Sequence, residues 1–392
     1  MNEPRTVYLD YSATTPVKEE VLQEMIPWFS EKFGNPSSIY TIGQESKEAI
    51  SLARRRVASL IGAAESEIYF TSSGTEADNW AIFGIADAMK SKGNHIITTK
   101  IEHHAVIHSC EFLEKRGYEV TYLDVDPTGR ISLDALKNAI TEKTILISIM
   151  MVNNEIGTIQ PIQEVVSIAK EKGIVVHTDA VQGPGNIPVN VKELGVDLMS
   201  ISAHKIYGPK GIGALYIRKG LKISNYMHGG GQENRKRAGT ENLAGIVGFG
   251  KAAELAGKDL YSHIARTTEL RDYFKDEVLK RIPDVDINGT MEFRHPGNIN
   301  LAFNFIEGEG ILLLLDNAGI YVSTGSACNS ASLSPSHVLS AIGVPVERIH
   351  GSIRFTIGDF TSREDLDYVL EVLTEVVAKL RSISSVNEQK GW

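Results

Sequence analysis

The chain has 392 residues, which is long enough for two domains with a sizeable core. Its 40 basic and 49 acidic residues leave a net charge of −9, so we expect no general nucleic-acid binding. No apolar stretch reaches the length of a membrane span, and two cysteines are too few for a disulfide scaffold. The first residues lack the hydrophobic core of a signal peptide, so we expect a cytoplasmic protein that does not contact membranes.

Apolar runs of strand length alternate with helical periodicity through the first two thirds of the chain. Strands are predicted at residues 94–100, 118–126, 144–154, 173–182 and 198–205. The segments between them, such as residues 164–173, have the periodicity of amphipathic helices that end in glycine. This alternation favours a mostly parallel sheet with helices on both faces, in which ligands gather at the carboxyl ends of the strands.

The pattern changes after about residue 258. A charged helix is predicted at residues 264–282, and a final helix follows at residues 366–383. Strands are predicted between them, near residues 298–305 and 352–358. We therefore predict a large domain over residues 15–258, and a smaller α+β domain built from residues 1–14 and 259–392.

Two polar residues at predicted strand ends suit a cofactor site. Asp179 ends one apolar run, and Lys205 follows another in the sequence Ser-Ala-His-Lys. A lysine amine can form a Schiff base with the aldehyde of pyridoxal phosphate (PLP), and a carboxylate can hold the pyridine nitrogen protonated. Most lysines are solvated surface charges, so this interpretation depends on other residues that fit the same cofactor.

A phosphate cradle is predicted within residues 67–86, which read as a strand, a turn and a helix. The backbone N–H groups of Gly74 and Thr75 would face an anion at the start of that helix, where the helix dipole adds attraction. An ordinary helix cap that pairs Ser73 with Glu76 would explain the same residues equally well.

Further phosphate ligands are expected beside the lysine, at Ser202 and His204. The glycines of residues 208–213 have the order Gly-x-x-Gly-x-Gly, which differs from the dinucleotide fingerprint. A β-turn followed by a strand explains them better, so a nicotinamide site is rejected.

A tandem pair of histidines, His103 and His104, follows the first of the predicted parallel strands. One of them could lie flat on a cofactor ring, where an imidazole both stacks and moves protons. A metal site that also uses His108 and Cys110 is an alternative, but the stretch lacks a second cysteine or a carboxylate pair at ligand spacing. We therefore expect no metal site in the chain itself.

The second chemical centre is Cys328, which lies in the small and polar stretch of residues 323–337. Such a stretch cannot bury itself, so we expect a mobile surface loop and an exposed thiol that acts as a nucleophile. Cys110 lies in a helical stretch and fits a buried face. Arg354 is predicted on a strand, where it would turn inward only to meet an anion such as a substrate carboxylate, although a surface salt bridge is the alternative.

The chain resembles a cysteine desulfurase of the NifS/IscS type, a family within the class-V aminotransferase-like, fold-type I PLP enzymes. The matching motifs are YLDYSATTPV, FGNPSS, SSGTEADN, EHHAV, VNNEIGTIQP, HTDAVQ, SAHKIYGPKGIG, GGGQE, RAGTEN, GSAC, SPSHVL and SIRFTIG, which span almost the whole length. The long loop around Cys328 resembles the group I branch. The resemblance implies a mostly parallel seven-stranded sheet sandwiched by helices, together with a smaller α+β domain.

The resemblance also implies roles for individual residues. Lys205 would be the Schiff-base lysine, Asp179 the partner of the pyridine nitrogen, and His104 the residue stacked on the ring. Cys328 would take the sulfur of the substrate. The remaining implied roles are a hydrogen bond to the phenolic oxygen for Gln182, phosphate binding for Gly74, Thr75, Ser202 and His204, phosphate binding across a homodimer for Thr240, and binding of the substrate carboxylate for Asn154 and Arg354.

The activity implied by the resemblance is the conversion of L-cysteine into L-alanine, with the sulfur held as a persulfide on Cys328. The implied acceptor is an iron–sulfur scaffold protein of the IscU/NifU type, and Cys328 could contact a shared cluster in that complex. Three alternatives stay open at this point: a selenocysteine lyase, a PLP aminotransferase, and a sulfur-carrier binding scaffold or PLP-binding regulator that is no enzyme.

Overall fold

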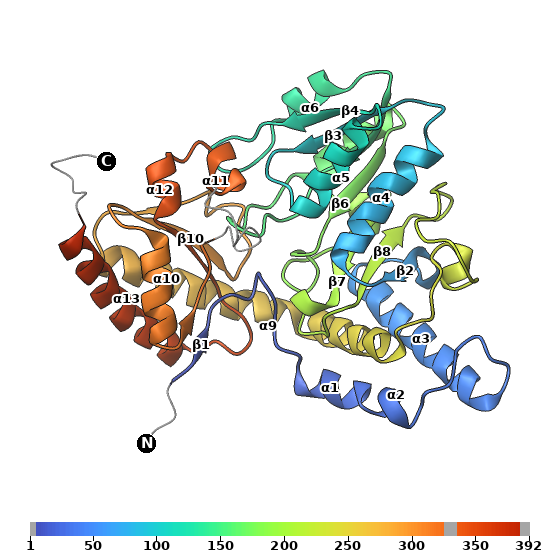
Figure 1. Ribbon diagram of the computed structural model, residues 1–392, viewed down its shortest axis with the longest axis horizontal. Coiled ribbons are helices and arrows are strands. Elements are labelled where there is room, and N and C mark those ends of the chain that lie inside the picture. Colours follow the sequence, from blue (N-terminus) through green and yellow to red (C-terminus); the bar gives the residue numbers. More distant parts are fainter. Residues whose placement is uncertain (1–4, 325–334, 385–392) are drawn as a thin grey trace.

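The structure is a computed structural model that describes residues 5–324 and 335–384, and its main element is a seven-stranded sheet (Figure 1). In spatial order its strands are β2 (Ile68–Thr71), β8 (Gly213–Ile217), β7 (Leu198–Ser202), β6 (Val175–Asp179), β5 (Thr144–Ser148), β3 (His95–Thr99) and β4 (Glu119–Leu123). The five strands from β7 to β4 are parallel, and β8 is antiparallel to both of its neighbours. The prediction of a mostly parallel seven-stranded sheet is confirmed.

Helices cover both faces of this sheet because successive side chains of each strand point to opposite sides. On β3, Ile96 packs in one hydrophobic cluster with Trp80 of α4, whereas Ile97 packs in another with Val165 of α7 and Phe249 of α9. The helices of this part of the chain are α1 (Glu19–Met25), α2 (Pro27–Ser30), α3 (Thr41–Leu60), α4 (Gly74–Ala88), α5 (His104–Glu114), α6 (Leu133–Ala139), α7 (Ile162–Glu171), α8 (Val191–Leu194) and α9 (Leu243–Arg281), with short 3₁₀ turns at Glu65–Glu67, Ala203–Lys205 and Glu233–Arg235.

The remaining elements form a smaller α+β unit. Its strands make an antiparallel sheet in the order β12-β10-β9 and a parallel pair of β1 with β11. Val7 and Leu9 at the N-terminus pack in the same hydrophobic core as Phe355 of β12. The elements of this unit are β1 (Val7–Tyr8), β9 (Val285–Ile287), β10 (Asn298–Phe303), β11 (Ile320–Tyr321), β12 (Ser352–Thr356), α10 (Gly308–Asn317), α11 (His337–Ala341), α12 (Val346–His350) and α13 (Arg363–Ile383).

Helix α9 joins the two units as one continuous helix of 39 residues (Figure 1). Its first turns contribute Phe249 to the core under the large sheet, and its last turns contribute Phe274 to the core of the smaller unit. The predicted helix at residues 264–282 is therefore only the second half of a longer one. The predicted domain boundary at residue 258 lies within this helix.

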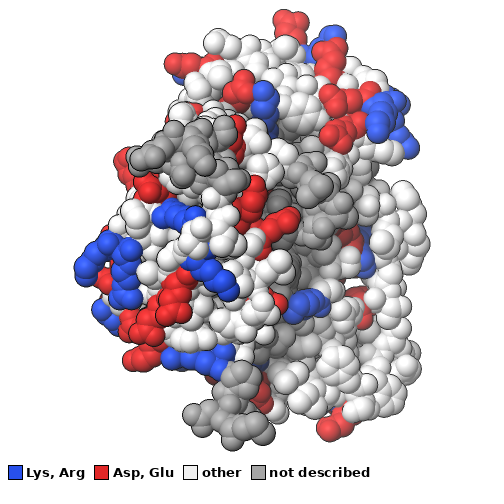
Figure 2. All heavy atoms as spheres, turned by 60° about the vertical axis from the view of Figure 1, so that its left-hand side comes forward, with Lys and Arg blue, Asp and Glu red and all other residues white. Residues whose placement is uncertain are grey.

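One face of the described chain carries charges of both signs (Figure 2). On the face shown in Figure 2, lysine and arginine side chains alternate with aspartate and glutamate, a pattern that is typical of a solvated surface. None of the described helices combines the length with the apolar character that crossing a bilayer requires.

Two glycines of α9 allow a test of its packing against α3. A Cβ atom at Gly250 would lie 2.5 Å from the Cα of Ala53, whereas a Cβ at Gly257 would meet only the Cδ1 of Leu60, at 3.7 Å. We expect Gly250→Ala to lower the thermal midpoint, because overpacking costs about 1–3 kcal/mol. Gly257→Ala should raise the midpoint, because alanine favours a helix over glycine by about 0.5–1 kcal/mol. Calorimetry checks both variants, and equal midpoints would contradict the close contact of α3 with α9.

Candidate functional site

Most of the predicted site residues line one cavity of about 320 Å³. The cavity lies where β6 and β7 end and α4 begins, at the carboxyl edge of the parallel strands, which is where such sheets collect ligands. The predicted residues in its wall are Gly74, Thr75, Asn154, Asp179, Gln182, Ser202, His204, Lys205 and Arg354.

Asp179 is the last residue of β6 and is buried, with 6 % of its surface exposed. Its Oδ1 accepts a hydrogen bond from the backbone N–H of Val181 at 3.0 Å. Burial raises the pKa of Asp179, while the nearby His103, the N–H of Val181 and Lys205 oppose that rise. The carboxyl group of Asp179 thus lies buried at the cavity wall, where a cationic ring nitrogen would favour its ionised form.

Lys205 ends the short 3₁₀ turn that follows β7. Its Nζ donates hydrogen bonds to the backbone carbonyls of Ser12 and, at 2.8 Å, of Ala13. The carbonyl of Ser12 also accepts a hydrogen bond from Nε2 of Gln182 at 2.9 Å. Backbone acceptors in the N-terminal part of the chain therefore hold the amine at the wall of the cavity.

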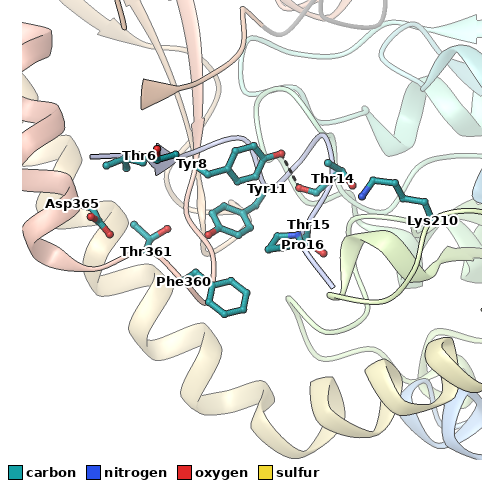
Figure 3. Close-up of a pocket in the computed structure, with 11 residues that line it drawn as sticks. Thr6, Tyr8, Tyr11, Thr14, Thr15, Pro16, Lys210, Phe360, Thr361 and Asp365 are labelled. Carbon is teal, nitrogen blue, oxygen red and sulfur yellow. Dashed lines mark hydrogen bonds between the residues drawn. The ribbon is translucent and has the colours of Figure 1, made fainter. Parts of the chain in front are cut away.

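These carbonyls belong to the N-terminal segment, residues 8–18, which runs from β1 to the start of α1. Thr15 Oγ1 donates to the carbonyl of His204 and accepts from the N–H of Tyr207. Tyr8 donates its hydroxyl to the carbonyl of Thr14 (Figure 3). A second cavity of about 410 Å³ lies beside the same segment, with Tyr8, Tyr11, Thr14, Thr15 and Pro16 among its lining residues (Figure 3).

Residues at the start of α4 both cap the helix and line the cavity. The Oγ of Ser73 accepts the N–H of Glu76 at 3.1 Å, so the predicted cap exists. Gly74 and Thr75 nevertheless line the cavity, at the positive end of a helix of 15 residues. A Cβ at Gly74 would come within 2.7 Å of Cγ2 of Val181, so glycine leaves open a cradle that a side chain would fill. The helix end can therefore receive a phosphate group.

The two adjacent histidines lie differently with respect to the cavity. His103 lines the cavity with Asp179 and Lys205, whereas His104 does not line it. His104 is the first residue of α5 and lies on an adjoining hollow, where its ring is 5.0 Å from that of His108. The cause is local: His103 is the N-cap of α5, where its Nδ1 accepts the N–H of Ala105 at 3.1 Å. An N-cap residue has extended backbone angles, so its side chain leaves the helix in a different direction from the next residue.

Arg354 lies on β12 with 3 % of its surface exposed, and its guanidinium reaches the cavity. It donates to Oδ1 of Asp10 at 2.6 Å and to the carbonyl of Asn154 at 3.0 Å. Its Nε has no hydrogen-bond partner among the described residues, so one donor stays available for a bound anion. Arg354 is therefore the residue through which the smaller unit contributes to the site.

The other sequence predictions concern residues outside this cavity. Thr240 is exposed, and it does not line the cavity. Cys328 lies outside the described residues. Cys110 is fully buried, as expected, and burial raises the pKa of its thiol to about 12. Within the described part of the chain, the predicted alternative of His103, His104, His108 and Cys110 does not bring its ligand atoms together as a metal site requires.

Sequence reasoning missed three residues at this site: Asp78, Ser12 and Ala13, all of which line the cavity. Asp78 is four residues after Gly74 in α4, and that helical spacing places both on one face. The spacing was a usable signal. Ser12 and Ala13 act through backbone carbonyls, and no side-chain pattern reveals such a role.

Comparisons with known proteins agree with this geometry. The family model described as aminotransferase class-V matches residues 7–369. A cysteine desulfurase IscS of Dictyoglomus turgidum is 61 % identical and covers 98 % of each chain, and one of Methanosarcina thermophila is 57 % identical and covers 99 % of this chain and 96 % of its own.

Solved structures extend the agreement to the fold. A NifS-like protein superposes with a TM-score of 0.91 at 39 % identity, covering 96 % of this chain and all of its own. A NifS-like protein of Rickettsia africae gives a TM-score of 0.86 at 31 % identity, covering 95 % of this chain and all of its own. The chain therefore belongs to the cysteine desulfurases of the aminotransferase class-V family.

Proposed function

We propose that this protein takes the sulfur from L-cysteine and leaves L-alanine, with PLP in the cavity of Lys205 and with Cys328 as the first sulfur acceptor. One observation carries the proposal: a lysine amine, a buried carboxylate and a helix N-terminus line the same cavity. These groups suit the aldehyde, the ring nitrogen and the phosphate of PLP in turn.

The residues divide the work at the cofactor. When bound, PLP supplies an electron sink for the charge that develops at Cα of the substrate. Asp179 would pair with the ring N–H, and the positive ring nitrogen would keep this carboxylate ionised. Burial is the largest cause that lowers the pKa of His103. A neutral imidazole would therefore face the ring. The Lys205 amine would hold the cofactor through its aldehyde, and after the amine of the substrate has displaced it there, the freed amine would move the Cα proton.

The phosphate end would use neutral donors as well as the helix. Burial lowers the pKa of His204 to about 4, so its imidazole is neutral at physiological pH. Gly74, Thr75 and Ser202 would supply the remaining hydrogen bonds. Thr240 would complete this end across a homodimer. Its exposure suits that role.

The substrate would bind at the opposite end of the cavity. The carboxylate of L-cysteine would accept the free Nε–H of Arg354, and Asn154 would assist. Cys328 would then attack the substrate sulfur as a thiolate and hold it as a persulfide. The acceptor that we propose for this sulfur is an iron–sulfur scaffold protein of the IscU/NifU type, since the matched relatives carry the name IscS.

The adjacent histidines give a matched pair of variants for the ring contact. His103→Ala should lower kcat about a hundredfold, which is the scale of a lost acid–base group, and should shift the visible absorption of bound PLP. His104→Ala should stay within about twofold, as expected of a residue outside the cavity. Alanine release and visible spectra check both variants. A larger loss for His104→Ala would return the stacking role to that residue.

The two cysteines give a second matched pair of variants, which tests the sulfur acceptor. Cys328→Ser should bind PLP and L-cysteine normally but form no persulfide and little alanine, because a hydroxyl is a far weaker nucleophile toward sulfur than a thiolate. Cys110→Ser should keep turnover and lose about 1–3 kcal/mol of stability, because it buries a hydroxyl group. Mass spectrometry after one turnover should place one additional sulfur atom on the Cys328 peptide. Finding that sulfur on Cys110 would refute the assignment.

A further inference from the structure

The cavity holds a second buried carboxyl group, Asp78, to which the proposed chemistry gives no role. Asp78 lies in the first turns of α4 with 1 % of its surface exposed. Its Oδ1 has no hydrogen-bond partner among the described residues, although it lines the cavity. A buried polar atom without a partner costs free energy, so such an atom at a site calls for an explanation.

Asp78 and Asp179 are close neighbours. One carboxylate oxygen of each and one ring nitrogen of His103 lie within 4.8 Å of one another. Asp78 is therefore beside the residue that would meet the ring nitrogen. Asp78 comes from a helix and Asp179 from the end of a strand, and only the packing of α4 against the sheet brings them together.

No positive charge balances Asp78. The groups that face it are His103 at the N-cap of α5, His177 and Asp179 on β6, Ser200 on β7, and Glu102 before α5. Burial lowers the pKa of His103, which favours its neutral form. His177 is 3.6 Å away, but burial lowers its pKa to about 3 and leaves the ring neutral. Its two nitrogens already contact the hydroxyls of Ser148 and Ser200, at 2.8 and 3.0 Å. Among the described residues, no lysine or arginine forms an ion pair with Asp78.

Two carboxyl groups within 4.8 Å of each other in a buried site disfavour ionisation of both, because the like charges repel where little water screens them. The ionised form is favoured more strongly at Asp179, because the N–H of Val181 donates a hydrogen bond to its carboxylate and the positive charge of Lys205 lies nearby. Asp78 has only the hydroxyl of Ser200 in its favour. Burial is the largest cause that holds the pKa of Asp78 well above its usual range, and the neighbouring Asp179 is the second largest. The proton of the pair therefore belongs on Asp78.

We propose that Asp78 is a neutral carboxylic acid in the working protein, and that it positions Asp179 as the single negative charge at the ring-nitrogen end of the cavity. The proposal rests on the proposed function for the identity of the ring. As a neutral acid, Asp78 carries a hydroxyl within 4.8 Å of the Asp179 carboxylate, and a small turn of the side chain would let it donate a hydrogen bond there and restrict the orientation of Asp179. Asp78 is thus a positioning residue that acts through Asp179.

Infrared spectroscopy of the full chain tests the location of the proton without any need for PLP. At pH 8 the difference between the parent and Asp78→Asn should contain the C=O stretching band of a protonated carboxylic acid. The same band should persist in Asp179→Asn. The proposal is overturned if this band is absent from the difference spectrum between the parent and Asp78→Asn. It is also overturned if the band is present in the parent but disappears in Asp179→Asn.

Thermal unfolding of the PLP-free chain gives the matching pH dependence. When folding raises the pKa of a carboxyl group, its contribution to the free energy of unfolding is fully present only below its pKa in the unfolded chain, about 4. That contribution is lost as the pH rises through the higher pKa of the folded chain. The midpoint of Asp78→Asn should therefore rise above that of the parent by an amount that grows between pH 5 and pH 9. A difference of the opposite sign at pH 8 that closes toward pH 3 would show an ionised Asp78.

The holoenzyme tests the positioning role. Asp78→Ala should weaken PLP binding about ten- to a hundredfold, the equivalent of one hydrogen bond to a charged group, and should alter the pH profile of the visible absorption. Asp78→Asn, a neutral group of the same shape, should restore most of both. An unchanged PLP affinity and pH profile in Asp78→Ala would refute the positioning role. Failure of the parent to bind PLP would instead refute the proposed function and leave the infrared result standing.

Discussion

The site depends on the hydrogen bonds that the N-terminal segment makes to both structural units at once. The carbonyls of Ser12 and Ala13 hold the Lys205 amine of the large unit. Two residues earlier, Asp10 holds the guanidinium of Arg354 in the smaller unit. The segment is itself fixed to β12, because the N–H of Ser12 donates to Oγ1 of Thr356 at 3.0 Å. The short stretch from Asp10 to Ala13 therefore sets the distance between Lys205 and Arg354.

This arrangement makes the cavity a product of three otherwise separate parts of the chain. The parallel sheet supplies the carboxyl group of Asp179, helix α4 supplies its positive end, and the smaller unit supplies Arg354. Helix α9 keeps the two units at a fixed spacing because it contributes to the hydrophobic core of each. The electrostatics follow from the burial: neutral histidines and few charges surround the cavity, so each remaining charge acts strongly on a ligand.

The sequence was sufficient where local pattern decides structure. Apolar runs with the correct length predicted the five parallel strands, and the polar residue at the end of a run predicted Asp179. The motif at the start of α4 predicted a turn that leads into a helix, and Gly74 and Thr75 at that start line the cavity. Cys110 was predicted as a buried thiol from helical periodicity.

The sequence could not decide features that depend on one residue of register or on a long-range contact. His103 and His104 differ only in which one caps α5, and neighbouring residues do not fix a helix boundary to one position. Asp78 and Asp179 are about a hundred residues apart, and only the packed fold makes them neighbours. The length of α9 was underestimated because its first turns lack the charged periodicity of its second half.

The central claim is that Lys205, held by the N-terminal carbonyls, is the residue that links to the cofactor. Borohydride reduction of the PLP-loaded protein, followed by peptide mass spectrometry, locates the attachment directly. The account predicts that the pyridoxyl mass appears on the peptide that contains Lys205 and disappears in Lys205→Ala. Attachment to another lysine, such as the exposed Lys210 five residues later, would contradict it.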